Sequence, residues 1–202
     1  TSIVNPLIAQ KIELQLPDSD IIYYPNFLRA ADAGHYFKAL KETIPWQQDD
    51  ITVFGKTHPQ PRLTALFGEN GKPYSYSNIT MYPHKFTAEL LELGNKLQTE
   101  IGIHFTSCLL NLYRNGKDSN GWHADDEKAL GKNPVIASIS LGQERYFHLK
   151  HKSKKDLKQK LLLEHGSLLL MKGETQHFWY HQIPKTTRPI QERINITFRI
   201  IK

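Results

Sequence analysis

The sequence predicts a mostly β fold with some helix (α+β), in which a jelly-roll core is supported by two helices. Three observations lead to this prediction: a long series of short apolar segments separated by turn residues, a C-terminal segment in which apolar and polar residues alternate, and two stretches of apolar residues at helical spacing. One domain is expected for 202 residues. Within residues 1–202 we expect an N-terminal arm with the first helix (1–50), a loop-rich part (51–85) and the jelly-roll core (103–202).

The first half of the chain predicts an arm, two helices and a loop-rich segment. Short apolar stretches interrupted by prolines predict an arm and a strand over residues 1–28. Residues 30–44 carry apolar side chains at helical spacing, and Pro45 ends that pattern. Residues 46–76 are rich in Pro, Gly and aromatic residues and predict strands with long loops. Residues 86–101 predict a second helix, which we expect to support a sheet and to carry no chemistry.

From residue 105 onward, short apolar segments follow one another, with turn signals such as Asn115-Gly116 and Lys172-Gly173 between them. Such a series is typical of a sandwich or barrel of the jelly-roll kind. The segments expected to form strands are 105–114, 135–141, 146–150, 160–163, 167–171, 178–183 and 193–201.

The last of these segments alternates strictly between apolar and polar residues. Its polar face carries Arg193, Asn195, Thr197 and Arg199. One interpretation is a sheet whose polar face meets solvent, as in many antiparallel sheets. The other is a polar lining inside a barrel, with two guanidiniums aimed at a dicarboxylate, because arginine binds carboxylates bidentately. Asn111 and Tyr113 also lie two residues apart, on one face of another predicted strand.

A metal-binding pattern lies between residues 111 and 127, where His123-Ala124-Asp125 forms an H-x-D pair. Residues two apart in an extended chain project to the same side, so both side chains can bind one ion. His181 is the best candidate for a third ligand. Two imidazoles and one carboxylate describe the facial triad of non-haem iron(II) oxygenases, which leaves positions open for a co-substrate and dioxygen. The pair alone is a weak signal, because a chain with 10 histidines can contain one by chance.

Taken together, these segments resemble the AlkB family of iron(II)- and 2-oxoglutarate-dependent dioxygenases. The resemblance rests on N-L-Y at 111–113, H-A-D-D-E at 123–127, W-Y-H-Q-I-P at 179–184 and R-I-N-I-T-F-R at 193–199. It runs from about Val53 to the C-terminus. Stretches such as VFGKTHPQPR and HGSLLLM are most similar to the DNA-repair homologue that prefers double strands.

The resemblance implies a double-stranded β-helix with two supporting helices, and iron(II), 2-oxoglutarate and dioxygen as cofactor and co-substrates. His123, Asp125 and His181 would be both the metal-binding and the catalytic residues. The expected 2-oxoglutarate set is Asn111, Tyr113, Arg193, Asn195, Thr197 and Arg199. Within it we expect Arg199, Asn195 and Asn111 at the 2-oxo-carboxylate end, and Arg193 with Tyr113 at the distal carboxylate.

The implied reaction is oxidative demethylation of 1-methyladenine and 3-methylcytosine in DNA, in single strands and in duplexes, with release of formaldehyde, succinate and CO2. Methylation at these positions leaves a cation and blocks pairing, so the base is easier to flip and stacks well on aromatic rings. Two alternatives stay open: a dioxygenase of the same fold acting on RNA, protein or a small molecule, and a nucleic-acid-binding module without turnover. The intact triad and both arginines argue against the second alternative.

Phe54 is the expected wedge for duplex DNA. Aromatic residues are more often core, but Phe54 is followed directly by Gly55-Lys56, which indicates the tip of a hairpin. The resemblance implies that residues 51–85 recognise the nucleotide and that Phe54 fills the gap left by a flipped base.

The flipped base itself would lie between Tyr76 and His123, according to the resemblance. The related repair enzyme has Phe where this chain has Tyr76, so the added hydroxyl needs a partner. Tyr74 and Glu127 would lie near the edge of the base, although acids such as Asp126 and Glu127 are more often ordinary loop residues. The other expected substrate contacts are Arg62 and Asp126.

Residues 151–160 form a basic tract, HKSKKDLKQK. One interpretation is a solvated loop that keeps a sheet edge from aggregating. The other is contact with DNA phosphates, and the resemblance implies a basic loop at this point. The groups available are His151, Lys152, Lys154, Lys155, Lys158 and Lys160, of which Lys154, Lys155 and Lys158 are the expected DNA contacts.

Composition sets the remaining expectations. A net charge of +6 and a pI near 9.3 are compatible with a polyanionic partner, although many basic proteins bind none. Cys108 is the only cysteine and is expected in the core, which favours a reducing, intracellular location: cytoplasm in a bacterium, nucleus in a eukaryote. No apolar run approaches the ~18 residues of a membrane span, and no N-terminal signal segment is present. The chain begins at Thr1 without Met, so a trimmed or processed N-terminus is one expectation. We expect a monomer.

Overall fold

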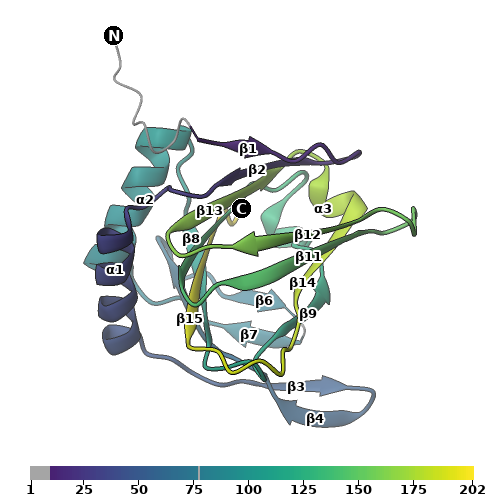
Figure 1. The fold of residues 1–202 in the computed structure, drawn as a ribbon. Coiled ribbons are helices and arrows are strands. Elements are labelled where there is room, and N and C mark those ends of the chain that lie inside the picture. The colour runs from purple at the N-terminus through teal and green to yellow at the C-terminus, as the bar shows by residue number, and fades with distance from the viewer. Residues whose placement is uncertain (1–9, 77) are drawn as a thin grey trace.

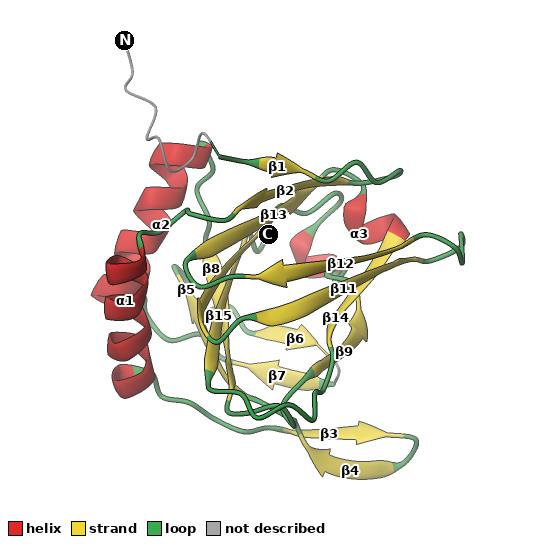
Figure 2. Ribbon diagram, viewed as in Figure 1, coloured by secondary structure: helices red, strands yellow, loops and turns green. Residues whose placement is uncertain are grey.

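The structure, a computed structural model, describes residues 10–202 except Ser77, so the first nine residues of the expected arm lie outside the described residues. Two antiparallel β-sheets face each other, and two long helices cover the outer side of the larger sheet (Figures 1 and 2). The predicted mostly β jelly-roll architecture with two supporting helices is therefore confirmed. No helix in the described part of the chain has the length and apolar content needed to span a bilayer.

The larger sheet has seven strands in the order β1-β2-β13-β10-β15-β8-β5. Their bounds are β1 Ile12–Glu13, β2 Asp20–Tyr24, β13 Ser167–Lys172, β10 Ile136–Gly142, β15 Arg193–Arg199, β8 Ser107–Tyr113 and β5 Leu63–Gly68. β15 and β8 lie near the middle and are buried along their whole length. Both of their faces are therefore covered, one by helices and one by the opposite sheet.

The smaller sheet has four strands in the order β12-β11-β14-β9, and two hairpins lie beside the pair of sheets. The smaller sheet consists of β12 Lys158–Leu163, β11 Arg145–His151, β14 Trp179–Ile183 and β9 Asn120–His123. The hairpins are β3 Asp50–Val53 with β4 Lys56–Pro59, and β6 Tyr74–Tyr76 with β7 Ile79–Met81. The β3–β4 hairpin extends away from the body at the lower edge of Figure 1.

Both predicted helices form, as α1 (Ala30–Thr43) and α2 (Ala88–Ile101). The stripe Leu90, Leu93 and Leu97 of α2 is fully buried in the core on the helix side of the larger sheet. Thr87 caps the helix by accepting a hydrogen bond from the Leu90 backbone N–H, and Gly102 ends it at a φ of 80°.

Two short helical segments were not predicted, α3 (Thr175–Phe178) and the 3₁₀ turn Lys128–Leu130. Because α3 occupies the residues before β14, the strand expected at 178–183 begins at Trp179. Cys108 is buried on β8, as expected, and burial raises the pKa of its thiol well above the usual value.

The exposure of the polar side chains of β15 shows whether this face meets solvent or lines the interior. All four polar side chains on it are at most 8% exposed. The interpretation of a solvent-facing sheet is therefore wrong, because this face lies between the two sheets and lines an internal cavity.

Candidate active site

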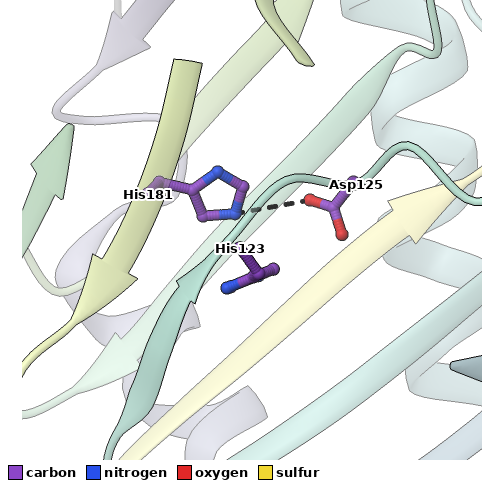
Figure 3. A group of neighbouring side chains, drawn as sticks. All are labelled: His123, Asp125 and His181. Atoms are coloured by element: carbon purple, nitrogen blue, oxygen red, sulfur yellow. Dashed lines mark ion pairs between the residues drawn. The ribbon is translucent and has the colours of Figure 1, made fainter. Parts of the chain in front are cut away.

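Three potential metal ligands meet where the smaller sheet faces the larger one. His123 ends β9 and lies opposite His181 of β14 in the strand register, while Asp125 follows two residues after β9. The ligand atoms of all three residues lie within 4.8 Å of one another (Figure 3). The imidazole Nε2 of His181 is 3.5 Å from Asp125 Oδ2, and the two imidazole ring centres are 4.2 Å apart. The predicted facial triad is thus assembled.

Neighbouring groups hold each ligand in place. The Nδ1 of His123 donates to the backbone carbonyl of Gly121 at 2.7 Å, which leaves Nε2 as the free lone pair. The Phe147 ring stacks on His181 with centres 5.1 Å apart. The backbone N–H of Asp125 donates to the Gln176 side chain at 2.9 Å. Gln176 is buried on α3, and no feature of the sequence pointed to it.

The charges of the site favour metal binding. Burial, with a contribution from His181, lowers the pKa of His123 to about 4, so its imidazole is neutral at pH 7. Burial opposes ionisation of Asp125, but the Arg199 guanidinium and the two imidazoles hold the pKa of this carboxyl well below its usual range. A neutral imidazole and an ionised carboxylate are the forms that bind a metal ion.

A cavity of about 800 Å³ opens in front of the triad. Its wall includes the whole predicted 2-oxoglutarate set: Asn111, Tyr113, Arg193, Asn195, Thr197 and Arg199. Arg199 lies beside the triad, where its Nη2 donates to Asp125 Oδ1 at 2.7 Å. Arg193 lies beside Tyr113 instead, with its guanidinium carbon 5.1 Å from the ring centre. The two arginines thus lie at different places in the cavity wall, and the division of the set between the two ends of the co-substrate stays a prediction.

Unpartnered donors in the cavity fit a dicarboxylate. Arg193 is 1% exposed and uses Nη2 to reach Ser140 at 3.0 Å, while its Nε and Nη1 have no hydrogen-bond partner among the described residues. The Nε of Arg199 is likewise without one. Burial lowers the pKa of Arg193 to about 10, so it remains charged at pH 7. Buried cationic donors without partners are costly unless an anion completes them, and 2-oxoglutarate carries two carboxylates.

A polar network joins the rest of this set. Asn195 donates to Ser138 at 2.6 Å and accepts from Thr197 at 2.8 Å and from Asn111 at 3.3 Å. Arg62, which we expected to contact DNA, is 7% exposed and donates to Asn111 Oδ1 at 2.9 Å. It also donates to the carbonyl of Ser119 at 3.1 Å, so its guanidinium is held by the protein.

The two tyrosines of β6 lie at different depths. Tyr76 lines the cavity, and its hydroxyl accepts a hydrogen bond from Gln60 at 3.3 Å, which supplies the partner that this hydroxyl needs. Tyr74 is 1% exposed and does not line the cavity. Its hydroxyl accepts from Arg199 Nη1 at 3.1 Å, so it supports that guanidinium.

The two acids after the triad also differ. Asp126 is exposed and pairs with Lys152 at 3.3 Å. Glu127 lines the cavity; burial raises the pKa of its carboxyl, and Arg199 offsets part of that rise. Asp126 also lines the cavity, but it is the more exposed of the two acids.

Phe54 occupies the tip of the β3–β4 hairpin and is 100% exposed. Phe54 and Gly55 have φ values of 49° and 75°, which are the left-handed values of a tight hairpin turn. The alternative that placed Phe54 in the core is therefore wrong.

The basic tract runs from the last residue of β11 through the connecting turn into the first residues of the edge strand β12. His151 is 5% exposed and donates from Nε2 to Asp18 at 3.0 Å, while its Nδ1 accepts from the Lys154 backbone at 3.0 Å. The Lys154 ammonium also binds Asp18, at 2.7 Å. His151 is therefore buried and held by protein groups, and the exposed Lys155 and Lys158 are the tract's clearer candidates for phosphate contact.

Comparisons with known proteins agree on one family. A family model described as the 2OG-Fe(II) oxygenase superfamily matches residues 20–199. Alpha-ketoglutarate-dependent dioxygenase alkB homolog 3 of Bos taurus is 41% identical over 91% of this chain and 66% of that protein. DNA oxidative demethylase ALKBH2 is 40% identical in Arabidopsis thaliana, over 91% of this chain and 67% of that protein, and 34% identical in Homo sapiens, over 88% and 72%.

The chain thus spans about two thirds of the length of the alkB homolog 3 proteins that it matches. The solved structure of OsALKBH1 covers 94% of this chain and 99% of that chain with a TM-score of 0.67 and 17% identity, which supports the fold alone.

Proposed function

The chain belongs to the 2OG-Fe(II) oxygenase superfamily, and on this premise we propose that it is an oxidative demethylase of 1-methyladenine and 3-methylcytosine in DNA. Relatives named as DNA oxidative demethylases support a DNA substrate. The observation that carries the proposal is the single cavity in which the metal triad, two buried arginines and Tyr76 meet.

His123, Asp125 and His181 would hold iron(II), and Arg193 and Arg199 would bind the two ends of 2-oxoglutarate. When bound, iron(II), 2-oxoglutarate and dioxygen supply the oxidation that hydroxylates the N-methyl group, after which the adduct releases formaldehyde. The protein supplies position: Arg199 holds Asp125 ionised, and the Gly121 carbonyl fixes the tautomer of His123.

The substrate side of the cavity suits a flipped, cationic base. Tyr76 offers an aromatic face, and the hydrogen bond from Gln60 fixes the position of its hydroxyl. The Glu127 carboxylate lies on the same cavity wall and can face the positive ring. A neutral, unmethylated base gains less from both contacts, which favours methylated substrates.

Duplex DNA is accepted through two further features. Phe54, exposed at the tip of its hairpin, can enter the base stack after the target base has left it. Lys155 and Lys158, exposed at the end of the smaller sheet, can contact phosphates. The protein acts as a monomer inside the cell, in the cytoplasm of a bacterium or in the nucleus of a eukaryote.

The test is an assay of formaldehyde and succinate on methylated single-stranded DNA, duplex DNA and RNA side by side, with unmethylated strands as controls. The proposal expects both products from both forms of methylated DNA. Turnover of RNA alone would replace DNA by RNA as the substrate, and no turnover of any methylated strand would reject a nucleic-acid demethylase.

A further inference from the structure

The outward side of the smaller sheet carries exposed aromatic and basic side chains. Strand alternation turns Phe147 and Leu149 of β11 into the core and leaves Tyr146, His148 and Lys150 outside. Register pairs Lys150 with Tyr180 of β14 and His148 with Lys160 of β12, so these residues share the same side. We call this set, with Trp122 of β9, the outer face: Trp122, Tyr146, His148, Lys150, Lys160 and Tyr180.

The aromatic rings of the outer face remain open to solvent. Tyr146 is 51% exposed, Trp122 40% and Tyr180 36%. The Lys150 ammonium lies 4.3 Å from the centre of the Trp122 ring, and the Lys152 ammonium lies 4.8 Å from that of Tyr180. Large exposed rings flanked by lysines are unusual on a surface that binds nothing, because aromatic side chains are normally buried.

The outer face borders two hollows of the molecule. Trp122 and Tyr180 line the cavity that holds the triad. At the other end, Tyr146 and His148 line a second hollow of about 410 Å³. Lys185 and Arg188 also line this hollow, and Glu144 is its only acid among the described residues. Aromatic and basic groups therefore follow one path from the reaction site outward.

We propose that the outer face binds the unpaired strand that flanks the target base, in a single-stranded nucleic acid. Bases would stack on Tyr146, Trp122 and Tyr180, and phosphates would meet Lys150 and the other lysines of this face. This combination of stacking rings and cations is the one by which proteins hold single strands without reading their sequence. A duplex offers phosphates but hides its base faces, so it gains less here. The inference rests on the proposed nucleic-acid substrate and adds a second binding surface, separate from the Phe54 hairpin.

The test measures binding of unmodified, fluorescently labelled DNA strands of about 4 and about 16 nucleotides, the range of site sizes on single-strand-binding folds. Wild-type protein should bind the long strand more tightly than the short one. Tyr146→Ala should weaken binding of the long strand by roughly five-fold or more, because each stacked base contributes on that order. Tyr146→Trp should keep the affinity, since it keeps a stacking ring.

Controls separate stacking from charge and from damage to the fold. Lys150→Ala should lower the slope of log affinity against log salt by about 0.7, as expected for one phosphate of a single strand, whereas Tyr146→Ala should leave the slope unchanged. Lys38→Ala, on the exposed side of α1, should change neither quantity. Melting curves check that Tyr146→Ala is folded.

Equal binding of the long strand by Tyr146→Ala and wild type would overturn the inference. So would an equal loss of affinity for a duplex of the same length, because a duplex does not expose its base faces. Binding of unmodified strands requires no turnover, so a protein that shows these effects but releases no formaldehyde would overturn the proposed function alone. RNA strands in the same assay determine whether the face distinguishes the two polymers.

Discussion

Replacing Phe54 by Ala tests whether the hairpin tip is a wedge. Because Phe54 is 100% exposed, the change removes no buried surface. The free energy of unfolding should therefore change by less than about 0.5 kcal/mol, as for other exposed positions. Truncation of a core Phe would cost about 3–5 kcal/mol instead.

The effect on activity should depend on the form of the DNA. An aromatic ring stacked on a base is worth about 1–3 kcal/mol, so kcat/KM on a methylated duplex should fall by roughly 5-fold to 150-fold. The same methylated strand without its complement has no stack to hold open, so its repair should change little. Formaldehyde release from both substrates measures the two values of kcat/KM.

Phe54→Leu is the matched control, because it keeps an apolar side chain that can enter the stack. It should retain more duplex activity than Phe54→Ala at the same stability. Equal losses on duplex and single strand, or a melting temperature lowered by several degrees, would refute the wedge.

The remaining predictions concern the metal, the co-substrate and the phosphates. Asp125→Ala, or a chelator, should abolish formaldehyde release, and zinc or nickel should occupy the site without giving product. Full activity of Asp125→Ala would show that His123, Asp125 and His181 do not hold the iron. Arg193→Ala should raise the apparent KM for 2-oxoglutarate about ten-fold or more, because a charge-assisted pair is worth about 1.5–3 kcal/mol. An unchanged KM together with weaker DNA binding would show that Arg193 binds DNA and not the co-substrate. Arg199→Ala should also weaken metal binding measured by calorimetry, since Arg199 holds Asp125. The double variant Lys155→Gln, Lys158→Gln should weaken duplex binding. It should also lower the slope of log affinity against log salt by about 0.9 for each phosphate that is no longer bound. An unchanged slope would show that these lysines are solvated and do not contact phosphates.

The regular spacing of apolar residues was enough to predict the helices and the strands that carry such a repeat. The stripe of α2 and the alternation of β15 each follow from one regular repeat, and both appear in the structure at the expected positions. The triad was also predictable, because two ligands belong to one short motif and the third lies in a segment that resembles the family. β9 was not among the predicted strands, since Asn120 and Gly121 give no apolar alternation.

Side-chain direction outside regular repeats could not be predicted. Arg62 lies in the bend before β5, where no alternation indicates a face, and the buried network around Asn111 determines that it points inward. Tyr74 and Tyr76 are two residues apart on β6, with ring centres 6.0 Å apart, but this spacing does not indicate how deep each side chain lies. The roles of Gln60 and Gln176 depend on contacts with distant segments, which only the folded chain brings together.

Oxidation at the His123, Asp125 and His181 site is tested most directly by quantifying all products from one substrate. A single-stranded oligonucleotide with one 1-methyladenine is incubated with iron(II) and 2-oxoglutarate, and adenine, formaldehyde and succinate are quantified together. Wild-type protein should give equal amounts of all three products, and Asp125→Ala should give none. Restored adenine without matching succinate, or the same yield from Asp125→Ala, would contradict an oxidation carried out at the His123, Asp125 and His181 site.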